Sequence, residues 1–182
     1  MNILKSNGGT FNVNHISHLL EDAASQRPLE KDKLNEIINI VITNLQKNTN
    51  AIALNIVLNP EEKNIWKSIS KNIKRLAPTS FPKIYILIRK MKGKITKYHE
   101  YRALLNSSAP KEIKTAGELM QKAILEQNCS SLEIFAPLGA NLNALLPIKL
   151  SPLILAINQD KSIIASCSMI ASLIINGADP NL

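Results

Sequence analysis

The segment Gly139-Ala140-Asn141-Leu142-Asn143 recurs further along the chain as Gly177-Ala178-Asp179-Pro180-Asn181. At the same offset the similarity extends upstream of the glycines to further aligned pairs, which are Cys129 with Cys167, Ser130 with Ser168, Leu132 with Ile170, and Phe135 with Leu173. A repeat with a fixed period of this length is typical of stacked helical units. The sequence therefore predicts that the C-terminal third of the chain consists of two related helix pairs.

The second copy has the local chemistry of a helix pair that ends in a turn. Ser151 can cap a helix that begins with Pro152, because the N–H that proline lacks would have no partner at the first helical position. A second helix is predicted over about Ser168–Asn176, and Gly177 ends it in the left-handed conformation that glycine tolerates best. The following Asp179-Pro180-Asn181 has the composition of a turn.

The order Ser151-Pro152-Leu153-x-x-Ala156 and then Gly177-Ala178-Asp179-x-Asn181 resembles the ankyrin repeat. The resemblance implies a pair of antiparallel helices and a projecting β-hairpin turn in each unit. It is best over Ser151–Asn181, and a weaker unit covers about Gly117–Asn143 with Ala123 at the position of the packing alanine. Together the two units span about a third of the chain.

Three departures from the family pattern are visible in the two units. Glu118-Leu119 replaces the Thr-Pro start of the first unit, and the second unit carries several extra residues near Asp160–Ser166. Ile154 stands where the family usually has histidine, so the hydrogen bonds of that side chain between repeats are absent. An ordinary helical hairpin that ends in glycine would explain one copy of the motif, but not the aligned pair.

The resemblance implies a protein–protein interaction module or adaptor, since partners of the family usually lie across the hairpin tips and inner helices. The expected contact residues are Leu145, Leu146, Ile148 and Lys149 at the tip, and Ile154 and Asn158 on the inner helix. Exposed apolar residues at a turn favour a covered surface. The alternative is that these residues pack against the N-terminal helices.

A solenoid buries its faces by stacking, and two units are few. Either the N-terminal helices cap the stack or the chain is a fragment and more repeats follow Leu182, because Asn181-Leu182 is where a further unit would start. Unfamiliar helical domains joined to degenerate ankyrin units also occur in bacterial proteins delivered into host cells. By analogy, an effector that acts on a host protein is a narrower form of the hypothesis.

The composition of the 182-residue chain, with 45% hydrophobic and 20% charged residues, is typical of a soluble globular protein. Its N-terminus lacks the apolar core and cleavage site of a secretory signal peptide. The apolar runs Ala51–Leu58 and Ile163–Ile175 are too short to cross a bilayer. These features predict a location in the cytoplasm, or in a host cytosol after delivery.

The two cysteines do not form a disulfide framework. Cys129 and Cys167 occupy the same position of consecutive units, and the spacing of stacked units that the resemblance implies is too wide for a disulfide. We therefore expect two reduced, small core residues in a reducing compartment.

Residues 1–110 form a helical domain of unknown family in this interpretation, and residues 111–182 hold the two units. Apolar residues at three- and four-residue steps predict a helix over Leu29–Lys47, and Asn59-Pro60-Glu61-Glu62 is a strong helix start. The whole protein is therefore expected to be all-α.

Two apolar segments of this domain are harder to assign. Ala51–Leu58 fits a buried strand or a short helix, and we favour a helix because no second strand is nearby. Phe81–Lys92 is buried but of undetermined type, and Gly93 is expected to interrupt it before a helix over Ile95–Asn106. Ser107-Ser108-Ala109-Pro110 is the predicted domain boundary.

Charge is concentrated in the middle of the chain. Residues 61–114 contain fourteen Lys and Arg against four Glu, a net charge of +10, whereas the remainder has eight basic and ten acidic residues. The whole chain's net charge of +8 therefore originates in the second half of the first domain and its boundary. Fields of this kind attract nucleic acid, acidic proteins or anionic lipid.

The densest basic stretch contains Arg89, Lys90, Lys92, Lys94 and Lys97. Tyr98 and Tyr101 could stack bases if this stretch bound nucleic acid. An acidic protein, or a membrane surface that takes up Phe81–Ile88, are two further alternatives. The sequence favours a fourth, an ordinary solvated helix face, because the basic residues interrupt apolar ones at helical spacing.

Signatures of metal sites and enzymes are missing from the sequence. His15 and His18 lie three residues apart, but only Glu21 and Asp22 are close, and no cysteine or third histidine completes a metal site. The six glycines form no phosphate-binding loop, and no Gly-x-Ser-x-Gly elbow is present. The prediction is a non-enzymatic protein without a cofactor, and an enzyme with an unrecognised active site is the remaining alternative.

Overall fold

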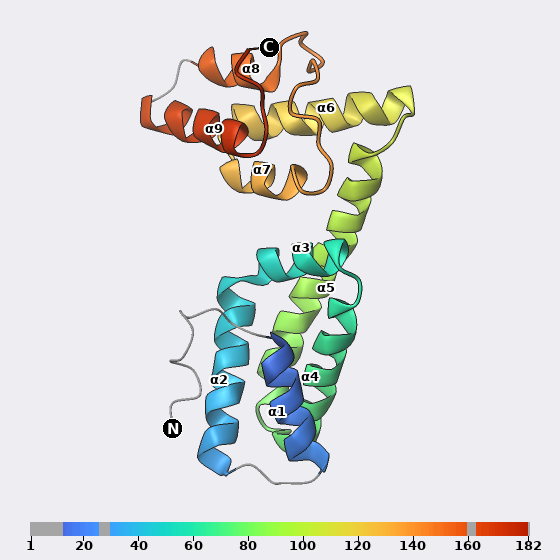
Figure 1. Ribbon diagram of the computed structural model, residues 1–182, viewed down its shortest axis with the longest axis vertical. Helices are drawn as coiled ribbons and strands as arrows, with labels where there is room; N and C mark the ends of the chain where they lie inside the picture. Colours follow the sequence, from blue (N-terminus) through green and yellow to red (C-terminus); the bar gives the residue numbers. More distant parts are fainter. Residues whose placement is uncertain (1–12, 26–29, 160–162, 182) are drawn as a thin grey trace. The chain divides into compact units, whose positions relative to one another are not determined.

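The computed structural model describes residues 13–25, 30–159 and 163–181, and these residues form helices and turns without any strand (Figure 1). The prediction of an all-α protein is therefore confirmed. The chain divides into two compact units, Met1–Thr96 and Lys97–Leu182, which we call unit 1 and unit 2. The division falls inside a helix, whereas the predicted boundary lies in the loop at residues 107–109 that follows this helix.

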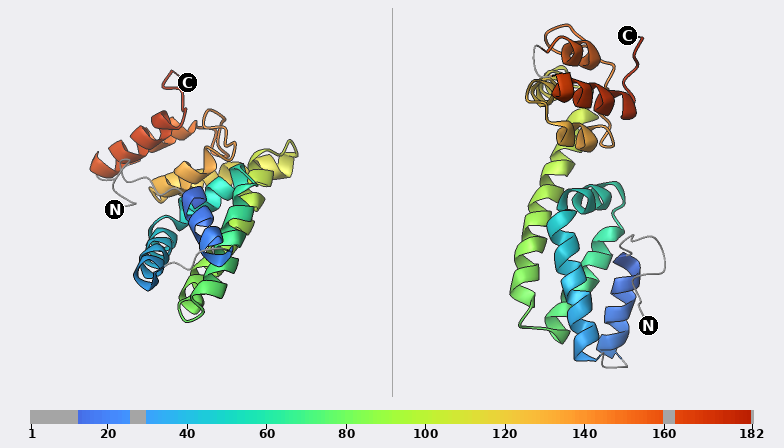
Figure 2. Two further views of the ribbon diagram at one scale, coloured as in Figure 1. Left: turned by 60° about the horizontal axis from the view of Figure 1, so that its bottom comes forward. Right: turned by 90° about the vertical axis from the view of Figure 1, so that its left-hand side faces the viewer.

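Unit 1 is a helical bundle. Its helices are α1 (Val13–Ser25), α2 (Lys31–Lys47), α3 (Thr49–Leu58), α4 (Glu62–Leu76) and the first part of α5 (Phe81–Leu105). Figures 1 and 2 show α1, α2, α4 and α5 running alongside one another, with α3 across one end. The core is aliphatic because each helix turns a three- and four-residue apolar stripe inward. Its fully buried members include Leu20, Val41, Leu45, Ile69, Ile73 and Ile84.

The segments that were hard to assign from sequence are both helical. Ala51–Leu58 lies within α3, so the choice of a helix is confirmed. Phe81–Lys92 and Ile95–Leu105 belong to one continuous helix, so the predicted interruption at Gly93 is wrong. A glycine inside a helix costs only about 1 kcal/mol, and the burial of Ile88 and Met91 on the same helix outweighs this cost.

A carboxylate joins α1 to α4, the two most closely packed helices of unit 1. Glu21 Oε1 accepts hydrogen bonds from the hydroxyls of Ser68 on α4 and Ser17 on α1. The pKa of Glu21 lies below its usual value, mainly because of the hydrogen bond from Ser68 and secondly because of the bond from Ser17. Since the bonds favour the charged carboxylate, they stabilise the fold above the ordinary pKa of glutamate, and this contribution is lost as the pH falls through the lowered pKa.

Unit 2 contains the last part of α5 and two helix pairs. These are α6 (Pro110–Leu125) with α7 (Cys129–Phe135), and α8 (Pro152–Ile157) with α9 (Ile163–Ile175). The pairs stack like on like, because α6 contacts α8 and α7 contacts α9. Ala123 and Ala156, which the sequence places at equivalent positions, are both buried in the shared core. Of the extra residues predicted near Asp160–Ser166, residues 160–162 lie outside the described residues and residues 163–166 belong to the first part of α9.

The sequence repeat reappears in the backbone of unit 2. Gly139 and Gly177 both have φ of 103°, in the region that favours glycine. Two hydrogen bonds close the end of the preceding helix in the same way in each copy. They run from Gly139 N–H to Ala136 O (3.0 Å) and Ala140 N–H to Phe135 O (3.0 Å), and from Gly177 N–H to Ile174 O (3.0 Å) and Ala178 N–H to Leu173 O (2.9 Å).

The two cysteines are both free thiols, but their environments differ. Cys129 is half-buried, whereas Cys167 is exposed on α9. The expectation that both are core residues is therefore wrong for Cys167. Helix α9 packs against α7, which carries Cys129, but the described residues contain no further helix pair that packs on α9 in the same way. Cys167 on α9 therefore lacks the cover that Cys129 has.

The glycines offer a graded test of the repeat. Gly177→Ala is expected to lower the free energy of unfolding by about 1–2 kcal/mol, because only the left-handed backbone opposes the new Cβ. Gly139→Ala is expected to cost more, because its Cβ would also meet Asn106 Oδ1 at 2.6 Å. The Asn106 amide cannot move without loss of its bonds to the Leu138 and Arg102 carbonyl oxygens. Chemical denaturation followed by circular dichroism measures all the variants.

Gly93→Ala is the control for this series. Its Cβ would meet nothing within 4 Å on a helix, so the variant is expected to gain about 0.5–1 kcal/mol. Equal destabilisation by Gly139→Ala and Gly177→Ala would contradict the role given to Asn106.

The hydroxyl of Ser68 is expected to control the titration of Glu21. In Ser68→Ala the pKa of Glu21 should rise toward its usual value, because the largest cause of its lowering is removed. Ser25→Ala is the matched control, since the Ser25 hydroxyl donates to the Glu21 backbone oxygen at 2.7 Å and not to the carboxylate. NMR titration of the Glu21 side chain measures both variants, and an unchanged pKa in Ser68→Ala would contradict the assignment.

Candidate functional site

One asparagine side chain joins the two copies of the repeated turn. The Asn143 amide oxygen accepts a hydrogen bond from the Asp179 backbone N–H at 2.7 Å, and its amide nitrogen donates to the Gly177 carbonyl at 3.4 Å. Each turn is also closed locally. Asn141 Oδ1 accepts from Asn143 N–H at 3.0 Å, and Asp179 Oδ1 accepts from Asn181 N–H at 2.8 Å. The first turn is thus fixed to the second by side-chain to backbone bonds.

The chain between Asn143 and α8 forms a tight loop in place of the β-hairpin that the resemblance implies. Leu146 N–H donates to Leu150 O at 2.9 Å, and Lys149 N–H donates to Leu146 O at 2.7 Å. Lys149 has φ of 60°, a conformation uncommon for a side chain with a Cβ. Ser151 then caps α8 by accepting from Ile154 N–H at 3.3 Å, as the sequence predicted.

This loop separates the predicted tip residues into two groups. Leu146 is only 5% exposed and packs with Leu142 and Leu153 in the core of unit 2, so it is not available to a partner. Its backbone bond to Leu150 folds it inward, which sequence spacing did not reveal. Leu145 and Ile148 are exposed to 71% and 43%, and Lys149 is also exposed.

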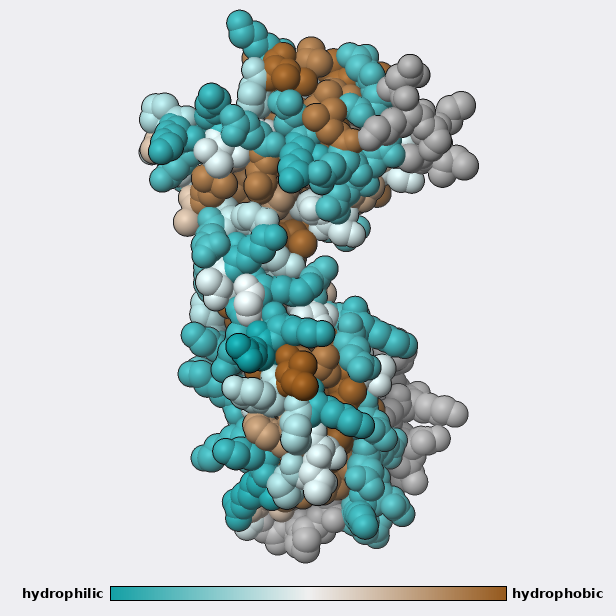
Figure 3. All heavy atoms as spheres, turned by 180° about the vertical axis from the view of Figure 1, so that it is seen from behind, coloured by the Kyte–Doolittle hydropathy of each residue, from teal (hydrophilic) through white to brown (hydrophobic). Residues whose placement is uncertain are grey.

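The two residues predicted on the inner helix lie on α8. Ile154 is 37% exposed, and Asn158 is exposed at the C-terminal end, where its backbone N–H bonds to the Ile154 carbonyl at 3.0 Å. Ile157 was not among the predicted contact residues, but it is 53% exposed and lies three residues after Ile154 on the same helix face. A spacing of three could have indicated it. Figure 3 shows apolar atoms in several places on the visible face of unit 2.

We refer to the exposed residues of this loop and of α8 as the turn surface. Its members are Leu145, Ile148, Lys149, Ile154, Ile157 and Asn158. The surface combines four large apolar side chains with one cation, and the repeated turns and the cap of α8 hold its backbone. An ordered surface of this kind can bury apolar area against a partner without first ordering the loop.

The predicted basic cluster is spread over different environments on α5. Arg89 and Lys90 are exposed, whereas the Lys94 ammonium group donates to Asn50 Oδ1 on α3. Lys92 lies two positions from each of Lys90 and Lys94, and two positions correspond to more than half a helical turn. The five residues therefore do not form one continuous stripe, and their binding role stays a prediction.

The aromatic residues next to this cluster have structural partners in unit 2. The Tyr101 ring meets the Phe135 ring edge-on at 5.1 Å, and the Tyr98 and Tyr101 ring centroids are 6.5 Å apart. Lys97 Nζ lies 5.3 Å from the Tyr101 ring centroid, and a hydrogen bond with Tyr101 raises the pKa of Lys97. Tyr98 is buried, and this burial raises its pKa, so it is not placed to stack on a base.

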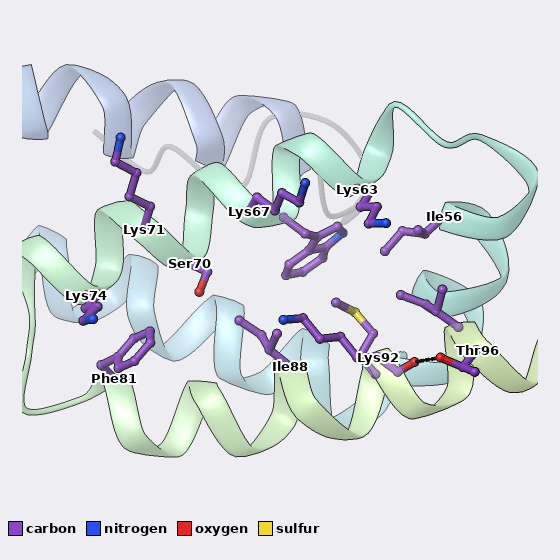
Figure 4. Close-up of a pocket in the computed structure, with 13 residues that line it drawn as sticks. Ile56, Lys63, Lys67, Ser70, Lys71, Lys74, Phe81, Ile88, Lys92 and Thr96 are labelled. Atoms are coloured by element: carbon purple, nitrogen blue, oxygen red, sulfur yellow. Dashed lines mark hydrogen bonds between the residues drawn. The ribbon is translucent and has the colours of Figure 1, made fainter.

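A groove of about 630 Å³ opens between α4 and α5 within unit 1 (Figure 4). Its apolar lining includes Ile56, Trp66, Phe81, Ile88, Met91 and Ile95, and its basic lining consists of Lys63, Lys67, Lys71, Lys74 and Lys92. The excess of positive charge in this region is visible in the sequence, but the groove is not. Helical periodicity assigns each lysine to a solvated face, and only the packing of two helices brings those faces together.

Two further observations concern metal ligands and membrane spans among the described residues. His18 Nδ1 lies 3.7 Å from Glu21 Oε2, and nowhere in the described ranges do three His, Cys, Asp or Glu side chains gather as metal ligands would. Within the same ranges, no helix combines the length and the apolar character needed to cross a membrane.

Comparison of the chain with protein-family models, curated proteins and solved structures gives no match.

The bridging role of Asn143 gives a direct test with an internal control. Asn143→Ala removes both bonds between the turns and is expected to lower the free energy of unfolding by about 1–2 kcal/mol. Asn181→Ala, one repeat period later, removes an amide whose side-chain bond stays within its own turn, to Asp179 at 3.0 Å, so we expect a smaller effect. Chemical denaturation of both variants compares them, and equal losses would contradict the bridge.

Proposed function

We propose that this protein is a non-enzymatic protein-binding module that holds its partner on the turn surface of unit 2. The observation that carries the proposal is the exposure of Leu145 and Ile148 on a loop fixed from both sides. Asn143 ties the preceding turn to the next copy, and Ser151 caps the helix that follows. Apolar side chains on an ordered, exposed loop are characteristic of surfaces that a partner covers.

The stacking of the helix pairs supports the narrower proposal that unit 2 is an ankyrin-like pair of repeats. Equivalent helices contact each other, α6 with α8 and α7 with α9. The sequence period is repeated in the φ angles and hydrogen bonds at Gly139 and Gly177. In such a stack the loops and first helices form a continuous binding face, and the turn surface combines a loop with α8. An effector that acts on a host protein is a still narrower form, and it rests on the resemblance alone.

Binding of nucleic acid through residues 61–114 is the competing proposal for the function. It depends on the high positive charge of this segment and predicts an affinity that falls steeply with salt. The burial of Tyr98 and the separation of Lys92 from Lys90 and Lys94 do not favour a stacking platform along α5. We therefore give the turn surface priority.

The proposal predicts that acidic substitutions on the turn surface abolish partner capture. Leu145→Asp and Ile148→Asp each place a charge where the partner would bury an apolar side chain, so recovery of the partner should fall at least about tenfold. Lys149→Glu should weaken capture through charge reversal. The measurement is a quantitative affinity pull-down from lysate, with and without nuclease, followed by mass spectrometry.

Ile86→Asp is the matched control for this experiment. Ile86 is 56% exposed on α5 in unit 1, so the same kind of substitution is made on another surface. Melting curves establish that the variants remain folded. Proteins recovered equally by the wild type and both turn-surface variants, or recovery that disappears with nuclease, would contradict the proposal.

A further inference from the structure

The groove between α4 and α5 has the dimensions and lining of a ligand site. Its volume of about 630 Å³ lies within the range of roughly 300–1,000 Å³ that small-molecule sites occupy. Ile56, Trp66, Ile88 and Met91 are buried at the base of the groove, and Phe81 and Ile95 are half-buried. The base is therefore apolar and belongs to the buried core of unit 1.

Three of the lysines that line this groove lie around its apolar base. Figure 4 shows the ammonium groups of Lys63 from α4 and Lys92 from α5 toward the space between the two helices, whereas that of Lys67 lies close to α4 at the edge of the groove. The other two are placed differently. Lys71 points away in the same view, and Lys74 Nζ lies 5.8 Å from the centroid of the Phe81 ring. The basic group that remains at the groove thus consists of Lys63, Lys67 and Lys92.

These three lysines have no acidic counterpart at the groove. No Asp or Glu is among its lining residues, and in the described parts of the chain no ion pair involves Lys63, Lys67 or Lys92. Like charges gathered next to an apolar wall repel one another, and the low dielectric constant of the wall increases this repulsion. An anion placed among the three ammonium groups would relieve it and stabilise the fold by linkage.

The apolar lining continues from the lysines toward the start of α5. Ile88 and Phe81 follow one another along this wall, two helical turns or about 10 Å apart on the helix. A compact anion would fill the basic part and leave this apolar wall in contact with water. A ligand that satisfies both parts needs an anionic group at one end and a flexible apolar chain at the other.

We propose that the groove binds a single-chain amphiphile with an anionic head group, a carboxylate or a phosphate. The head group lies among Lys63, Lys67 and Lys92, and the apolar chain lies along Ile88 and Phe81. The site lies wholly within unit 1, whereas the turn surface belongs to unit 2. This proposal is therefore independent of the proposed protein partner, and each can fail without the other.

The test uses decyl phosphate below its micelle-forming concentration, with two matched probes. Inorganic phosphate supplies the head group alone, and decyl maltoside supplies the chain with a neutral head. Trp66 lines the groove and is the single tryptophan of the chain, so its emission reports binding, with calorimetry as the independent readout. We expect saturable binding of one decyl phosphate per chain, and at least about tenfold weaker binding of either matched probe.

Two double variants separate the lysines of the groove from general positive charge. Lys67→Gln with Lys92→Gln should weaken decyl phosphate binding at least about tenfold, because two charge-assisted contacts are lost. Lys83→Gln with Lys90→Gln removes the same charge from exposed positions of α5 outside the groove and should have little effect. All four residues are exposed, so the variants are expected to fold, and circular dichroism checks this.

Several outcomes would overturn the proposal. Equal affinity for inorganic phosphate would leave an anion site without a chain site, and equal affinity for decyl maltoside would leave an apolar groove without a head-group site. Equal losses in the two double variants would show an effect of net charge alone. Binding to phosphatidylglycerol vesicles without binding to monomeric decyl phosphate would indicate a membrane surface in place of a single molecule.

Discussion

The hydrogen bonds of the Asn143 side chain hold the two turns of unit 2 together. They satisfy a backbone N–H and a carbonyl of the following copy, at Asp179 and Gly177, with one amide group. The geometry requires both turns to leave their helices in the same direction. The left-handed glycines provide this, since Gly139 and Gly177 share one φ and one hydrogen-bond pattern. The period of the sequence is therefore also a repeat in space. The exposed loop between Asn143 and α8 is held in place by the two turns.

The two units solve different packing problems with similar aliphatic residues. Unit 1 packs long amphipathic helices into a bundle. The lysine-bearing faces of α4 and α5 lie opposite each other at the groove. Unit 2 has shorter helices, and its core depends on stacking one pair against the next. The consequences for binding differ too. Unit 1 offers a concave groove with an apolar base, whereas unit 2 offers a loop with exposed Leu145 and Ile148.

Much of the fold could be predicted because local signals dominate in helical proteins. Proline and serine at the start of α8 and glycine after α9 mark boundaries through backbone chemistry alone. The predictions were wrong where burial outweighs a local preference. Gly93 does not interrupt α5, and Leu146 turns inward although it lies in a loop. The groove could not be predicted, since its lysines are distant in sequence, from Lys63 on α4 to Lys92 on α5, and meet only through tertiary packing.

Native-state hydrogen exchange at the Asp179 amide tests the central claim most directly. In the wild type this N–H donates to the Asn143 side chain, so it should be protected although it lies in an exposed turn. In Asn143→Ala its protection should be lost, while the Ala140 amide, which donates to the Phe135 carbonyl within the first copy, keeps its own. An Asp179 amide that exchanges freely in the wild type, or equally in both proteins, would contradict the repeat-to-repeat bridge.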